Sequence, residues 1–198
     1  MCADALPSYG MEITVCRAVD VPLLDQYIGS PGATSFHARR FERQERGTST
    51  YLVAWLDGRP VGHTELRWGG CDDAAVRAAR PGCPEINALA EWPPTLRSRG
   101  IGSALVRAAE ERARERGRTA IGLGVADDNP RAAALYARLG YVPLGSYNGR
   151  WSYEDHDGVT RECVEELTFL VKELVRARPV QRTHADVQRT SGQSRGTQ

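Results

Sequence analysis

One short segment constrains the fold of this chain more than any other: Arg97-Ser98-Arg99-Gly100-Ile101-Gly102-Ser103, a basic turn with two glycines. Residues 85–92 before it are typical of a strand, and the apolar spacing after it predicts a helix from about Gly100 to Arg116. A strand that passes through a glycine turn into a helix points free backbone N–H groups at one place, which favours an anion. The two arginines add guanidinium groups whose geometry suits phosphate oxygens. The segment therefore predicts a phosphate-bearing ligand.

The bulk composition argues against several classes of protein. With 198 residues, of which 41% are hydrophobic and 26% charged, the chain fits one domain with its own core. The net charge of +1 gives no electrostatic reason to expect nucleic acid or an anionic membrane as a partner. No apolar run approaches the roughly 20 residues of a bilayer span, and no signal peptide is recognisable. The five cysteines lack metal-ligand spacing, so no metal site is expected. Cys71 and Cys83 could pair across a loop, but free thiols in a cytoplasmic chain are the preferred interpretation.

The order of the remaining patterns predicts a mixed α/β fold, with hairpins in the first half and βα units in the second. Strands are expected at 11–18, 50–56, 60–68, 85–92, 119–125, 141–147 and 163–173, and helices at 20–27, 36–46, 100–116 and 130–140. A loop over 69–84 includes a short helical piece at 74–79, and a polar hairpin segment joins the last two strands. We expect a flexible N-terminus at 1–10, one domain at 11–175 and a disordered polar tail at 176–198.

Two nucleotide-binding motifs do not fit the glycine turn. A P-loop requires a Lys-Ser or Lys-Thr pair after its last glycine, and the turn has no lysine. A dinucleotide-binding turn needs a third glycine, but position 105 is Leu, and the turn lies in the middle of the chain after a hairpin. Both readings are therefore weak.

A second segment, Asn129-Pro130-Arg131-Ala132-Ala133-Ala134-Leu135-Tyr136-Ala137-Arg138-Leu139-Gly140-Tyr141, leads to a family. It resembles the N-x-x-A-x-x-L-Y-x-x-x-G-F segment of the GNAT N-acetyltransferase superfamily, and Arg97-x-x-Gly100-x-Gly102 resembles the family's acetyl-CoA pyrophosphate loop. The resemblance covers about residues 11–173. It implies a GNAT fold, which is a twisted, mixed but mostly antiparallel sheet of six to seven strands. About four helices flank this sheet, which is splayed between its fourth and fifth strands.

The resemblance also implies a line of cofactor-binding residues. The backbone of Ala90 and Trp92 would pair with the pantetheine arm of acetyl-CoA, and the N–H groups of the glycine turn would hold its pyrophosphate. Asn129 would contact the pantetheine or simply cap its helix. The full set of expected cofactor-binding residues is Ala90, Trp92, Arg97, Ser98, Arg99, Gly100, Ile101, Gly102, Ser103, Asn129 and Tyr136.

Amide formation from a thioester and an amine requires a base, because an ammonium group has no lone pair. By resemblance, Tyr136 is the acid that protonates the leaving thiolate; alternatively, it only packs against the sheet and the cofactor. Glu85 and Glu91 are the candidate bases, with a slight preference for Glu85. They have the same strand parity, which a bulge would break.

The expected function is transfer of an acetyl group from acetyl-CoA to a primary amine of a small molecule or peptide, directly in a ternary complex. The acceptor site is expected in residues 27–41, in the 69–84 loop and near Tyr147–Tyr153. Asp72 and Asp73 could attract a cationic amine or simply be solvated. An aromatic acceptor pocket could be lined by Phe36, Trp68, Trp151 and Tyr153, some of which must belong to the core. The oligomeric state stays open between monomer and homodimer, and neither nucleic acid nor a membrane is an expected partner. A non-catalytic acyl-CoA sensor or interaction module on the same fold is the alternative, and a nucleotide-phosphate binder is a third possibility.

Overall fold

The computed structural model describes residues 10–30, 32 and 34–174. The segment expected to be flexible, apart from Gly10, and the expected tail at 176–198 lie outside the described residues.

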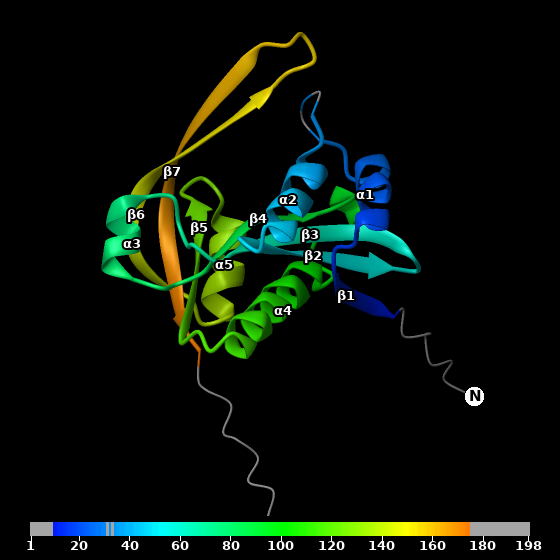
Figure 1. Ribbon diagram of the computed structural model, residues 1–198. Helices are drawn as coiled ribbons and strands as arrows, with labels where there is room; N and C mark the ends of the chain where they lie inside the picture. Colours follow the sequence, from blue (N-terminus) through cyan, green and yellow to red (C-terminus); the bar gives the residue numbers. More distant parts are fainter. Residues whose placement is uncertain (1–9, 31, 33, 175–198) are drawn as a thin grey trace, which may run out of the picture.

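The described chain forms one seven-stranded sheet with the order β1-β2-β3-β4-β5-β7-β6 (Figure 1). Its strands are β1 (Met11–Val15), β2 (Ser49–Leu56), β3 (Arg59–Arg67), β4 (Glu85–Glu91), β5 (Ala120–Ala126), β6 (Val142–Glu154) and β7 (Thr160–Glu173). The α-helices are α1 (Val21–Tyr27), α2 (Phe36–Glu45), α3 (Ala74–Ala79), α4 (Ile101–Glu115) and α5 (Pro130–Arg138). Short 3-10 turns cover Ala18–Asp20 and Pro94–Leu96. The expected mixed architecture is confirmed.

The helices cover both faces of the sheet. Helices α4 and α5 pack on one face, here called the α4 face, where Leu105 and Tyr136 join Leu66, Ile86 and Leu123 in the largest apolar cluster. Helices α1, α2 and α3 lie on the opposite face, here called the α2 face. Side chains alternate between faces along each strand, so a residue's strand position decides which helices it meets.

A bulge in β4 shifts this alternation. His63 pairs with Ala90 and Glu65 pairs with Asn87, so Ala88 and Leu89 lie opposite Thr64 alone. Ala88 has a φ of 51°, which is uncommon for a residue with a Cβ. As a result, Glu85 faces the α2 side, whereas Glu91 faces α4. The sequence parity, which placed both glutamates on one side unless a bulge intervened, is broken by this bulge.

Strands β4 and β5 separate soon after they meet. Their parallel pairing is confined to Glu85 with Gly122 and Ile86 with Leu123. Beyond Ile86 the two strands diverge, which leaves a gap beside β4 from Asn87 to Glu91. This confirms the expected splay between the fourth and fifth strands.

The last two strands differ most from expectation. They run from Val142 to Glu154 and from Thr160 to Glu173, so most of the segment predicted as a polar connection is strand. The outer halves of β6 and β7 form a two-stranded arm that extends beyond the sheet, yellow to orange in Figure 1. Both of its faces are largely exposed, and the usual apolar alternation is therefore missing from the sequence. Strand β1 is also shorter than expected and ends at Val15, because the 3-10 turn follows.

Candidate active site

The glycine turn leads into α4 as predicted. Gly100 is the residue before the first turn of α4 and has a φ of 87°, a left-handed conformation that glycine adopts without strain. Ser98 is also left-handed, with a φ of 66°. The first N–H groups of a helix have no partner within it, and Gly100 has no side chain that could cap them. The turn therefore presents backbone donors at one end of the β4–β5 gap.

The basic side chains of the turn are accessible. Arg97 and Arg99 are exposed, and neither forms an ion pair with another residue that the structure describes. A third arginine, which sequence reasoning did not single out as a ligand, extends from α5: Arg131 donates from Nη2 to the Ser98 hydroxyl at 2.9 Å. These three guanidinium groups surround a turn that carries no acidic residue of its own.

Glu91 is bound to the same helix end. Its Oε1 accepts from the Gly102 N–H at 2.8 Å. A Cβ on Gly102 would lie only 2.6 Å from that oxygen, so the absence of a side chain permits the contact. The arrangement gives Glu91 the part of a helix cap that Gly100 cannot fill. Glu91 therefore lies at the α4 end of the gap and away from the α2 face.

The backbone of β4 faces the gap at alternate residues. Ala90 pairs with His63 of β3, and the Trp92 N–H donates to the Val61 carbonyl at 2.8 Å. Because successive residues in an antiparallel ladder point their N–H and C=O groups to opposite edges, Glu91 presents these groups to the gap. The Trp92 N–H is thus held by β3, while its indole is 46% exposed at the end of the strand.

Tyr136 lies on α5 at the α4 face. It is only 7% exposed, and its ring meets that of Tyr141 at a centroid distance of 6.1 Å. Burial, with a smaller contribution from the Glu91 carboxylate, raises the pKa of Tyr136 to about 12. Its hydroxyl forms no hydrogen bond with another residue in the described part of the chain. Tyr136 is therefore a protonated donor whose hydrogen is available to a ligand.

Asn129 caps α5. Its Oδ1 accepts from the Ala132 N–H at 3.1 Å, and Pro130 follows at the first helical position. This geometry accounts for Asn129 without a ligand.

Glu85 lies on the α2 face where β4 and β5 begin to separate. Its side chain is 3% exposed, and Arg67 Nη1 lies 3.4 Å from its Oε2. Burial raises the pKa of Glu85 above its usual value, and the Arg67 guanidinium offsets part of this effect. A buried carboxylate with a raised pKa is a better proton acceptor than one in water.

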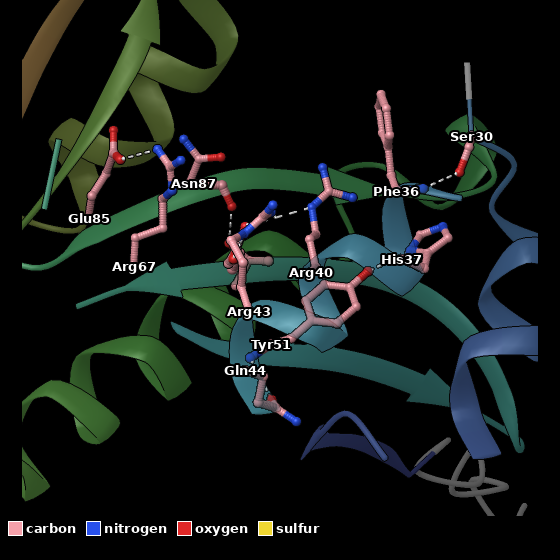
Figure 2. A network of polar contacts seen from close by, with 12 residues as sticks. Ser30, Phe36, His37, Arg40, Arg43, Gln44, Tyr51, Arg67, Glu85 and Asn87 are labelled. Atoms are coloured by element: carbon pink, nitrogen blue, oxygen red, sulfur yellow. Dashed lines mark hydrogen bonds and ion pairs between the residues drawn. The ribbon is translucent and has the colours of Figure 1, made fainter. Parts of the chain in front are cut away.

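The α2 face also carries a polar network that sequence reasoning missed (Figure 2). Glu65 is held by Arg43 through two hydrogen bonds of 2.7 and 2.6 Å. His37 lies 2.6 Å from the Tyr51 hydroxyl and 2.6 Å from the Ile28 carbonyl. Only the alternation along β3 could have pointed to this network, because Glu65 and Arg67 lie at positions of one parity in that strand.

The residues expected at the acceptor site divide into two groups: some have a structural role, and the others lie near Glu85, on α2 or on the arm. Trp68 belongs to the α4-face core, where Arg116 covers its ring at 3.9 Å, and Asp73 caps α3. Asp72 bonds Arg67 at 2.7 Å and stays near Glu85. Phe36 projects from α2, while Trp151 and Tyr153 stack on the arm at 5.6 Å.

The arm and the α1–α2 connection meet above the α2 face. A methyl group at Gly32 would overlap the Glu154 carbonyl, so the two segments are in close contact there. A separate cavity of about 670 Å³ lies at the end of β4, between the β2–β3 turn and Trp92. It is lined by Tyr27, Leu56, Asp57, Arg59, Pro60, Val61, Trp92, Pro93 and Leu96.

Among residues 10–30, 32 and 34–174, no group of three or more His, Cys, Asp or Glu side chains could hold a metal ion. No helix in these ranges is long and apolar enough to cross a bilayer.

Two comparisons of the sequence find similar proteins. The profile of the Acetyltransferase (GNAT) family matches residues 22–141. A curated relative, an uncharacterized N-acetyltransferase of Methanocaldococcus jannaschii, is 32% identical over 97 residues, which are 49% of this chain and 41% of the relative. The match thus spans less than half the length of that protein.

Solved structures share the fold. An N-acetyltransferase from Staphylococcus aureus Mu50 gives a TM-score of 0.62 at 15% identity, over 84% of this chain and 99% of the other. The ribosomal-protein-S18-alanine N-acetyltransferase of Escherichia coli gives 0.59 at 18% identity, over 86% and 98%. The protein yncA of Salmonella typhimurium, solved with its cofactor acetyl-CoA, gives 0.58 at 17% identity, over 85% and 96%.

Proposed function

The chain belongs to the GNAT acetyltransferase family, and we propose that it transfers an acetyl group from acetyl-CoA directly to a primary amine. The observation that carries the proposal is the alignment of three features along one gap. The basic glycine turn lies at one end, the unpaired edge of β4 borders the gap, and a buried, protonated tyrosine stands on its α4 side.

The unpaired edge of β4 has a length that suits the extended arm of a phosphate-bearing thioester. From Glu91 to Asn87 an extended strand covers roughly 13 Å at about 3.3 Å per residue. With the pyrophosphate at the N–H groups of residues 98–103, and Arg97, Arg99 and Arg131 around it, the pantetheine would follow β4 inward. The reactive end would then lie near Asn87, where β4 leaves β5. Acetyl-CoA supplies an activated acyl group and a thiolate that can leave.

Glu85 would act as the base on the acceptor side. An alkyl ammonium has a pKa of about 10, so most of the acceptor is protonated at neutral pH. Glu85 faces the α2 side at the inner end of the gap, and its raised pKa favours acceptance of that proton, directly or through water. The neutral nitrogen then forms the new C–N bond, and the C–S bond breaks.

Tyr136 would serve the leaving group from the opposite face. With its pKa at about 12, it keeps its proton at neutral pH and can donate it toward sulfur as negative charge develops there. In this proposal the sheet separates the two groups. Tyr136 lies on the side of the leaving thiolate, and Glu85 lies on the side from which the amine approaches.

An acetylated enzyme intermediate is not required. Burial raises the pKa of the Cys16 thiol to about 12 and that of Cys83 to about 11, and it also raises the pKa of Cys71. These thiols remain protonated near neutral pH and are poor nucleophiles.

A thiol-release assay tests the proposal. The chain is incubated with acetyl-CoA and a panel of primary amines, and free CoA is followed with a thiol reagent. We expect release that depends on both the amine and the chain. Calorimetric binding of acetyl-CoA with no release for any amine would contradict the proposal and favour an acyl-CoA sensor.

A further inference from the structure

In the described part of the chain, Arg40 shares its one carboxylate partner with Arg43. Its side chain is 12% exposed, and its Nε lies 4.0 Å from Glu65, the one carboxylate within ion-pair distance among the described residues. That carboxylate is already bound at both oxygens by Arg43. Arg40, Arg43 and Glu65 together thus carry one surplus positive charge.

The imidazole and aromatic side chains around Arg40 add no negative charge. Burial lowers the pKa of both His37 and His63, and the Arg40 charge lowers it further, so the two imidazoles are neutral at pH 7. The guanidinium lies between aromatic rings, with its Cζ 5.3 Å from the Phe36 centroid and 6.0 Å from the Tyr51 centroid. An incompletely paired charge in such surroundings is unfavourable unless an anion joins it.

Arg40 lies close to the proposed transfer point. Glu65, which it contacts, pairs across the sheet with Asn87, the first residue of β4 beyond the pairing with β5. Neighbouring strands are about 5 Å apart. Figure 2 shows Arg40, Arg67 and Asn87 on the same side of the sheet, with Glu85 bonded to Arg67. A molecule only a few bonds long therefore reaches from Arg40 to the inner end of the gap.

We propose that Arg40 binds a carboxylate of the acceptor, so that the amine substrate is a small amino acid. The inference rests on the proposed acetyl transfer and names the class of its acceptor. A guanidinium offers paired N–H donors that match a carboxylate, and a monoanion balances one surplus positive charge. The amine of the same molecule would then lie toward Asn87 and Glu85. Phe36 and the arm residues Trp151 and Tyr153 would contact its side chain.

Matched acceptor pairs test the proposal. Rates of CoA release are measured for a set of free amino acids and for the corresponding amino acid amides, which keep the amine and the side chain but lose the carboxylate. We expect the free acids to have kcat/KM values on the order of 100-fold higher, as for a partly buried charge pair that loses one partner.

Variants of Arg40 test whether this residue causes the preference for free amino acids over their amides. Arg40→Met keeps an unbranched side chain without the charge and should abolish most of the discrimination between acid and amide. Arg40→Lys should restore part of it. Arg39→Ala, an exposed neighbour on α2, serves as the matched control and should keep the full preference.

Melting temperatures and activities distinguish a failure of this inference from a failure of the proposed function. Arg40→Met should melt at or near the temperature of the unmodified chain, because the charge it removes is incompletely paired. Amides acetylated as fast as acids by the unmodified chain would overturn this inference and leave acetyl transfer intact. A preference that persists in folded Arg40→Met would overturn it as well. No CoA release with any amine would instead contradict the proposed function.

Discussion

Glu85 and Glu91 lie on the same strand, yet their carboxylates face opposite sides of the sheet. The bulge at Ala88 and Leu89 turns Glu91 toward the Gly102 N–H and leaves Glu85 beside Arg67. The two side chains have the same chemistry, and their surroundings assign them different tasks. The division between the proposed base and the helix cap follows from one additional backbone residue in β4.

Replacement of Glu85 by Gln should remove the increase of kcat/KM with pH on the acidic side of the pH profile. Because the pKa of Glu85 is raised, kcat/KM of the unmodified chain should increase with pH as this carboxyl loses its proton, at a pH above the usual glutamate value. Glu85→Gln cannot accept the proton and should reduce kcat/KM about 100-fold. Initial rates across a pH series measure both effects.

Glu45→Gln, at an exposed position of α2, is the control and should keep the profile of the unmodified chain. If Glu85→Gln kept the same profile as well, Glu85 would not be the base.

Tyr136→Phe should lower kcat by about 100-fold, since removal of a positioned proton donor typically has an effect of this size. The dissociation constant of acetyl-CoA should change little, because the ring that packs in the core is retained. Stopped assays for kcat and calorimetry for acetyl-CoA binding give the two values.

Tyr141→Phe is the matched control. Its ring adjoins that of Tyr136, but its hydroxyl donates to Glu110 at 3.2 Å, away from the gap. It should lose about 1–2 kcal/mol of stability and keep its turnover. Equal losses of turnover in both variants would point to packing and would contradict an acid role for Tyr136.

At the residue scale, sequence motifs located single residues of the candidate site, but they could not predict which side chains contact one another. Tyr136, Asn129 and the glycine turn are local signals, whereas Arg40 and Arg43 carry no motif. Their importance arises because β2, β3 and α2 bring Tyr51, Glu65 and His37 together. Contacts between residues far apart in the chain leave no spacing that a single sequence reveals.

Helix α4 begins at the proposed pyrophosphate site, where the Glu91 carboxylate already accepts from the Gly102 N–H. Glu91→Gln should therefore strengthen binding of acetyl-CoA several-fold, because a negative charge is removed from the proposed pyrophosphate site. The same change should lower the stability of the free protein by about 0.5–1 kcal/mol, because the helix end loses its anionic cap. Calorimetry and thermal unfolding measure the two effects.

Glu111→Gln, an exposed change on the same helix, should leave the affinity for acetyl-CoA unchanged. Weaker binding by Glu91→Gln would show that Glu91 holds the turn in its binding conformation, contrary to the expectation.

The β6–β7 arm should matter for the acceptor and not for acetyl-CoA. Trp151 is 43% exposed and stacks on Tyr153, so Trp151→Ala should raise the KM of the acceptor with little change in melting temperature. Val164→Ala, on the opposite side of the arm, should have no such effect. An unchanged KM in Trp151→Ala would exclude this face of the arm from the acceptor site.

Elements with a buried face were predictable, and the arm was not. Strand β5 and helix α4 each bury a continuous apolar surface, which their sequence periodicity records. The outer halves of β6 and β7 bury almost nothing, so their polar sequence resembles a loop. Their strand character comes from pairing with each other, which local composition does not encode.

At the scale of the whole molecule, the proposed acid and the proposed base lie on opposite sides of one sheet. The gap between β4 and β5 opens toward α4, the glycine turn and Tyr136. The polar network around Glu65, together with Glu85, faces α2. In this arrangement both substrates would be bound together and would meet only where β4 leaves β5. The order of strands and helices in the sequence predicted this architecture, while the register shift that aims the side chains emerged only from the structure.

Transfer of a labelled acetyl group tests the central claim most directly. The chain is mixed with acetyl-CoA labelled in its acetyl group and with an amino acid acceptor, and mass spectrometry follows the label in both the acceptor and the protein. We predict that the label appears on the acceptor nitrogen together with an equivalent of free CoA, while the protein stays unlabelled. Label that remains on CoA, or that accumulates on the protein, would contradict direct acetyl transfer to an amine.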